Sequence, residues 1–90
     1  MVELVLREST RVVRMDAGHL IVETGRSQRF AIEIKSSDRV DEKEVRAFER
    51  LARDVPKSRM IFISNDPVAQ RHGQVECLPW RDALALLFGD

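Results

Sequence analysis

The sequence predicts a small mixed α/β domain built on one central sheet. Its length of 90 residues is that of a single domain. Short apolar stretches separated by turn residues fill residues 1–36, which is typical of an antiparallel meander. A helical pattern and another apolar stretch follow, in the order of a strand–helix–strand crossover between parallel strands. We therefore expect residues 1–90 to form one domain.

The composition is that of a soluble globular chain, with 43% hydrophobic and 33% charged residues. Lys and Arg number 15 and Asp and Glu number 15, so the net charge is zero, which argues against a dedicated nucleic-acid-binding protein. Cys77 is the single cysteine, which excludes an internal disulfide and predicts a small buried hydrophobe. The chain has no apolar run near the ~18 residues of a membrane span and no signal-peptide pattern, so we expect a cytoplasmic protein without a membrane partner.

Four strands are expected in the first part of the chain, at 2–6, 11–15, 19–23 and 29–35. Asp16 and Gly18 supply turn chemistry between the second and third of these strands. A segment with Gly25 joins the third and fourth as a hairpin.

The next element is a helix predicted from about Glu42 to about Asp54. Asp41 stands in the capping position with Glu44 three residues later, and the helix must stop before Pro56. A buried strand is expected at 60–64 and a further short strand at 75–78, separated by a loop at 65–74 and followed by a last helix from residue 79. The apolar stripe of the first helix consists of Val45, Phe48, Leu51, Ala52 and Val55.

Glu33 and Lys35 form the first candidate site. Side chains alternate between the faces of a strand, so these two share one face while Ile32 and Ile34 share the other. One interpretation is an edge strand with a solvated face. The other is a metal site at the sheet rim, where Glu33 binds Mg²⁺ or Mn²⁺ and Lys35 positions the water that attacks a phosphodiester.

Three motifs carry a resemblance to a known family. They are the hairpin at 13–23 that leads into Ala31-Ile32-Glu33-Ile34-Lys35-Ser36-Ser37, the segment at 62–67, and Cys77-Leu78-Pro79-Trp80 with the residues that follow. From Val12 onward the chain resembles the C-terminal domain of a large prokaryotic family of AAA-type ATPases. That domain is similar to the restriction-endonuclease-like, PD-(D/E)xK fold. The resemblance implies a central mixed sheet with an antiparallel N-terminal meander, one crossover helix and a C-terminal helix.

The chain departs from that family at the first metal ligand. Family members carry an Asp on the strand before the Glu-x-Lys strand, and an apolar residue stands at that position here. Asp16 and Glu23 are the carboxylates that can substitute, and each lies at a strand end. Turn formation is the simpler role for Asp16. The chain also lacks a Gly-x-x-x-x-Gly-Lys-Ser/Thr phosphate loop, so an ATPase portion is absent from it.

Three functions follow as hypotheses. The first is a nuclease-like domain that has lost cleavage and serves as an interaction module, through a homodimer or protein partner on an exposed apolar patch. The second is a Mg²⁺-dependent DNA or RNA phosphodiesterase with Glu33 and Lys35 as catalytic residues and Glu23 or Asp16 as the further metal ligand. The third is nucleic-acid binding without cleavage at a basic end of the sheet. Its basic residues are Arg26, Arg29, Arg39 and Lys43, whose simpler role is a solvated rim.

Two aromatic side chains also have alternative interpretations. Trp80 at a helix start is a core residue or, less simply, a stacking platform for a base. His19 is a strand-start residue or a general base.

Overall fold

The computed structural model describes residues 11–16, 19–23, 28–55 and 57–88, and it describes the backbone alone for residues 11–16, 19 and 23. The strand predicted at 2–6 and the basic residue Arg26 lie outside the described residues.

The described strands form one six-stranded sheet in the order β1-β2-β3-β4-β6-β5. The first three pair antiparallel, β4 and β6 run parallel to β3, and β5 is antiparallel to β6. This arrangement confirms the mixed α/β class, the meander and the parallel crossover. The strands are β1 (Arg11–Asp16), β2 (His19–Glu23), β3 (Arg29–Ile34), β4 (Ser58–Ser64), β5 (Gln70–His72) and β6 (Val75–Pro79).

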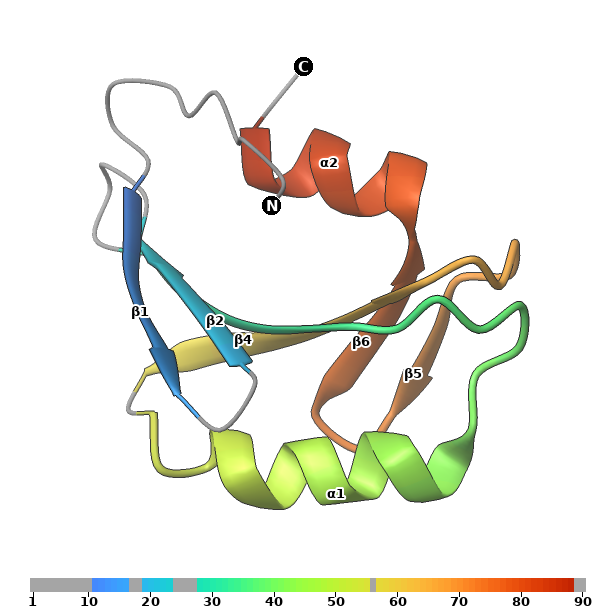
Figure 1. The fold of residues 1–90 in the computed structure, drawn as a ribbon, viewed down its shortest axis with the longest axis horizontal. Coiled ribbons are helices and arrows are strands. Elements are labelled where there is room, and N and C mark those ends of the chain that lie inside the picture. Colours follow the sequence, from blue (N-terminus) through green and yellow to red (C-terminus); the bar gives the residue numbers. More distant parts are fainter. Residues whose placement is uncertain (1–10, 17–18, 24–27, 56, 89–90) are drawn as a thin grey trace.

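Two helices cover opposite faces of the sheet, α1 (Glu42–Ala52) below and α2 (Trp80–Phe88) above in Figure 1. Successive strand residues point to alternate faces, so each strand contributes to both cores. Ala31 and Phe62 belong to the core between the sheet and α1, whereas Ile32 and Ile61 belong to the core between the sheet and α2. The four residues 60–63 of β4 are all buried, as expected of a central parallel strand covered on both sides.

Helix α1 begins as predicted and ends two residues earlier than predicted. The Asp41 side chain caps it by accepting a hydrogen bond from the Lys43 amide at 2.9 Å. At the other end the amides of Asp54 and Val55 bond to carbonyls three residues back, at 3.4 and 3.0 Å. These tighter turns replace the α-helical pattern because the chain must return to β4.

Strand β5 lies inside the segment predicted to be a loop, and that part of the prediction is wrong. Three polar residues show no alternation of apolar side chains, so β5 has no sequence pattern of its own. It pairs with β6, with Arg71 opposite Glu76. The turn between them uses Gly73 at φ +61, in the left-handed region that favours glycine.

Both outer strands of the described sheet are poor templates for further pairing. β1 carries a bulge between Val12 and Arg14, and β5 has only three residues. Bulges and short edge strands are two ways in which proteins prevent unwanted strand addition.

Candidate functional site

Glu33 and Lys35 lie on one face of β3, as the strand period predicts. The Lys35 Nζ atom is 3.5 Å from Glu33 Oε1, which makes an ion pair. The Glu33 side chain is 15% exposed and that of Lys35 is 42% exposed, so the carboxylate is the more enclosed partner. Glu33 is in register with Phe62, which belongs to the core between the sheet and α1. The pair therefore sits on the α1 side of the sheet, near the carboxyl end of β3.

The strand register distinguishes the two candidates for a second carboxylate. Glu23 pairs with Arg29, at the opposite end of β3 from Glu33. Four residues of strand separate these levels, or about 13 Å. The backbone of Glu23 is therefore far from the ion pair.

Asp16 lies at the Glu33 end of the sheet. It pairs with His19 on β2, and the next residue of β2, Leu20, pairs with Ile32 on β3. Continuing this antiparallel register by one step brings His19 level with Glu33. Asp16, His19 and Glu33 thus occupy one row across three strands, and the outer two are about 9–10 Å apart at their backbones. Of the two predicted substitutes, Asp16 is the one whose backbone is at the right level.

The basic residues predicted to line one end of the sheet fall at two different ends. Arg29 begins β3 and is in register with Ser58, whereas Arg39 and Lys43 follow the carboxyl end of that strand. Since β3 has six residues, and therefore five steps, its ends are about 16 Å apart. The described part of this group therefore does not form one continuous track.

A buried carboxylate, Asp66, joins the start of α1 to the end of β4. It is 8% exposed, and its two oxygens accept hydrogen bonds from the amides of Val40 and Val68, both at 3.0 Å. The Val40 hydrogen bond and then the Val68 hydrogen bond hold the pKa of Asp66 below its usual value, so the group stays ionised. The local bond to Val68 lies at the start of the loop predicted at 65–74, but no sequence pattern indicates the bond to Val40, 26 residues away.

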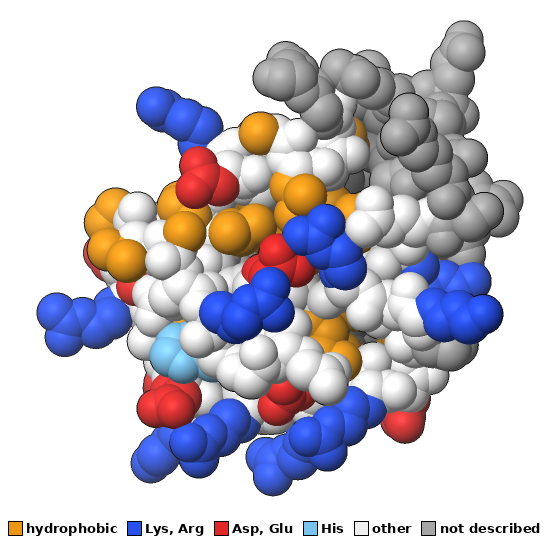
Figure 2. All heavy atoms as spheres, turned by 180° about the vertical axis from the view of Figure 1, so that it is seen from behind, with side chains coloured by type: hydrophobic (Ala, Val, Ile, Leu, Met, Phe, Trp, Pro, Cys, Tyr) orange, Lys and Arg blue, Asp and Glu red, His pale blue; other side chains and the backbone are white. Residues whose placement is uncertain are grey.

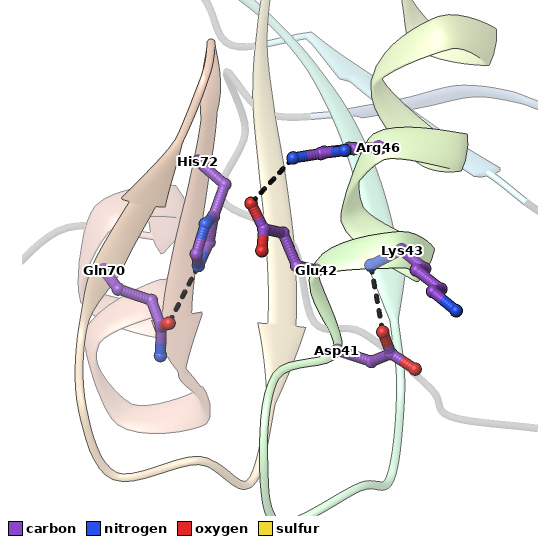
Figure 3. A network of polar contacts seen from close by, with 6 residues as sticks. All are labelled: Asp41, Glu42, Lys43, Arg46, Gln70 and His72. Atoms are coloured by element: carbon purple, nitrogen blue, oxygen red, sulfur yellow. Dashed lines mark hydrogen bonds and ion pairs between the residues drawn. The ribbon is translucent and has the colours of Figure 1, made fainter.

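The Asp66 network continues to His72 through Gln70. Gln70 Nε2 donates to Asp66 Oδ2 at 3.3 Å and to the Val68 carbonyl at 3.2 Å. These two acceptors fix the orientation of the Gln70 amide, so that its Oε1 atom faces His72. That oxygen lies 2.9 Å from Nε2 of His72, so this ring nitrogen carries the hydrogen. Figure 3 shows Gln70 and His72 on β5 facing Glu42 and Arg46 on α1.

A cleft of about 390 Å³ separates α1 from β5 at this place. Its carboxylates already have partners, because Glu42 accepts from Arg46 at 3.1 Å and Glu49 accepts from the Gln74 amide at 2.8 Å. The cleft is lined by two carboxylates and two arginines, so it does not concentrate charge of one sign. The lining residues are Glu42, Arg46, Glu49, Arg71, His72 and Gly73.

Cys77 and Trp80 have the structural roles predicted for them. Burial, and then the negative charge of Asp66, raises the pKa of the Cys77 thiol to about 11, so it stays protonated at neutral pH. Trp80, the first residue of α2, is partly buried and packs against the core on that side of the sheet.

An apolar hollow of about 30 Å³ lies between α2 and the sheet. Ile34 is 46% exposed and Leu84 is 43% exposed at its borders, so the hollow opens onto an apolar surface. Figure 2 shows apolar side chains gathered across the upper half of one face of the molecule. The hollow is lined by Leu20, Val22, Ile32, Ile34, Ile63, Trp80, Leu84, Leu87 and Phe88.

Comparison of the chain with protein-family models, with curated proteins and with solved structures finds no match. Among the side chains that the structure describes, no three His, Cys, Asp or Glu residues come together in a way that would hold a metal ion. None of the described helices has the length and apolar character needed to cross a membrane.

Proposed function

We propose that this domain is an accessory module of restriction-endonuclease-like fold that does not cleave phosphodiesters and acts by binding a protein partner. The ion pair between Glu33 and Lys35 carries this proposal. A metal ligand must offer its carboxylate to the ion, yet Glu33 is largely enclosed and lies beside the ammonium of Lys35. A metal would have to displace that interaction before Lys35 could position water.

A calorimetric Mn²⁺ titration tests the proposal. We expect no saturable heat for the wild type, and identical titrations for Glu33→Gln and for Asp82→Asn, an exposed carboxylate on α2 that serves as the matched control. We also expect intact plasmid DNA and RNA after incubation with Mg²⁺ or Mn²⁺. Mn²⁺ binding and cleavage that disappear in Glu33→Gln and persist in Asp82→Asn would refute the proposal.

A metal-dependent phosphodiesterase is the second candidate, and the row formed by Asp16, His19 and Glu33 favours it. In this reading Asp16 is the second metal ligand and Glu23 is not, because Glu23 is about 13 Å along the sheet from Glu33. The two readings differ in one experiment. Mn²⁺ affinity that falls in Asp16→Asn and not in Glu23→Gln supports the enzyme. Titrations without saturable heat for the wild type and for both variants support the accessory module.

The partner surface of the accessory module is the apolar hollow with its exposed borders. A 90-residue domain has a modest core, and the apolar surface that its described residues present beside that core favours association with a second copy. We expect sedimentation equilibrium at micromolar concentration to show a dimer. Leu84→Asp should convert it to monomer, whereas Val68→Asp, at a residue that is 61% exposed and does not line the hollow, should not. A wild-type monomer would contradict this part of the proposal.

A further inference from the structure

The solvent side of α1 carries a row of cations. Lys43, Arg46, Arg50 and Arg53 are spaced three, four and three residues apart, which places them on one stripe of the helix. All four are exposed, with Arg46 and Arg53 at 70% and 64%. Figure 2 shows Lys and Arg side chains gathered along the lower edge of the molecule, where α1 lies in Figure 1. We call these four residues the α1 cation row.

A fifth exposed cation follows the row along the chain. Lys57 lies in the turn between α1 and β4 with φ +56, in the left-handed region. Glycine is the usual residue at such a position after a helix, because it has no Cβ to strain. Lys57 therefore occupies a backbone position that favours glycine.

The acidic residues of α1 neutralise only part of the row. Glu42 pairs with Arg46 at 3.1 Å and Glu49 pairs with Arg53 at 3.8 Å, and both acids line the cleft beside β5. In the described part of the chain, Lys43 has no acidic partner. The same holds for Arg50, which lies midway along the row.

We infer that the α1 cation row binds the phosphate backbone of a nucleic-acid duplex. From Lys43 to Arg53 the helix rises about 15 Å, which matches about four phosphates along one strand of a duplex. Three of the four cations are arginines, whose planar guanidinium groups match phosphate oxygens in a bidentate way. This inference goes beyond the proposed function and does not depend on it, because it uses neither a metal nor Glu33.

Two other anionic partners fit the row less well. A membrane-surface helix inserts an apolar face into the lipid, but the apolar face of α1 is already used: Val45, Phe48 and Ala52 are buried in the core. An acidic protein partner would need an apolar centre within the contact, and Leu51, at 49% exposed, is the one large apolar side chain that α1 exposes beside the four charged residues of the row. A regular polyphosphate needs neither feature.

Fluorescence anisotropy with a labelled 20-base-pair DNA duplex, in EDTA, tests the inference. Four phosphate contacts predict a slope of about −3.6 for log K against log salt, and a loss of affinity of roughly 150-fold between 50 and 200 mM salt. Arg50→Ala should make the slope shallower by about 0.9, and adding Lys43→Ala should do so again. Arg81→Ala is the matched control, since it removes an exposed arginine from α2 on the opposite face.

The outcomes separate the possibilities. Slopes that flatten in the two α1 variants and stay unchanged in Arg81→Ala support the inference. Equal effects of Arg50→Ala and Arg81→Ala would overturn it, because attraction would then depend on overall charge. Binding to vesicles that contain phosphatidylserine with no binding to the duplex would also overturn it, as would no binding to either at 50 mM salt. Both α1 side chains are exposed, and unchanged melting temperatures verify that the variants remain folded.

Discussion

Replacing Gly73 by alanine should destabilise the domain through two separate effects. The first is the backbone, because φ +61 is strained for a residue with a Cβ and costs about 1–2 kcal/mol. The second is a close approach, because the added Cβ would lie 2.5 Å from Oε2 of Glu49, which must move. That oxygen accepts the Gln74 amide at 2.8 Å, and losing this hydrogen bond costs about 1 kcal/mol. Together they predict a free energy of unfolding lower by about 2–3 kcal/mol.

Thermal and urea unfolding followed by circular dichroism measure this loss. For a domain of this size, it corresponds to a melting temperature lower by roughly 10–20 °C, with an unchanged urea m-value. Glu49→Ala separates the two effects. In that background Gly73→Ala should cost only the backbone share, about 1–2 kcal/mol, which leaves a coupling energy of about 1 kcal/mol. Equal costs of Gly73→Ala in both backgrounds would refute the close approach, and a cost below about 0.5 kcal/mol would refute the backbone argument as well.

Further predictions concern charge, strain and reactivity. Acidification should lower the free energy of unfolding as the pH falls below about 4.5. The pKa of Glu76 is lowered chiefly by its hydrogen bond from Arg59, so this carboxylate stabilises the fold above its unfolded pKa and loses that contribution as it is protonated; a pH series of urea midpoints checks this. Arg59→Met removes the hydrogen bonds of 3.0 and 2.6 Å to Glu76, so it should lower the free energy of unfolding by about 1–2 kcal/mol and narrow the pH range over which acid destabilises the domain. A change near zero in urea unfolding would contradict this prediction. Lys57→Gly should raise the unfolding free energy by roughly 0.5 kcal/mol by removing left-handed strain, and a loss would contradict that account. Cys77 should react with a thiol reagent at pH 8 only after urea unfolding, and rapid reaction of the native protein would show that the thiol is accessible.

Much of the fold follows from short-range patterns. The capping residue and the apolar spacing of α1 predict its start and most of its buried face, and the period of two in β3 places Glu33 and Lys35 together. These features depend on residues two to four positions apart, which a sequence displays directly. Leu51 is the part of the predicted apolar stripe that is wrong, because it is 49% exposed, on the solvent side of the helix. The end of α1 is less well determined, because the turn that returns the chain to β4 ends the helix before the pattern does.

The candidate site depended more on the pairing of strands than on the strands themselves. The sequence presents Asp16 and Glu23 as equivalent substitutes, the first at the end of β1 and the second at the end of β2. The register alone distinguishes them, since it brings Asp16 level with Glu33 and places Glu23 beside Arg29. A shift of the strand pairing by one residue would move both carboxylates relative to Glu33. The composition of the strands therefore does not predict which carboxylate lies level with Glu33.

The sequence by itself determined the α/β class, the meander, the crossover and the face that Glu33 shares with Lys35. Only the tertiary structure revealed β5, the bond from the Val40 amide to Asp66, and the close approach of Gly73 to Glu49. The bond from Val40 to Asp66 and the approach of Gly73 to Glu49 join segments that are distant along the chain, whereas β5 is a short polar strand that pairs with the neighbouring β6. Their stability comes from hydrogen bonds and steric fit in the folded structure, and such contacts leave no periodic pattern in the residues that make them.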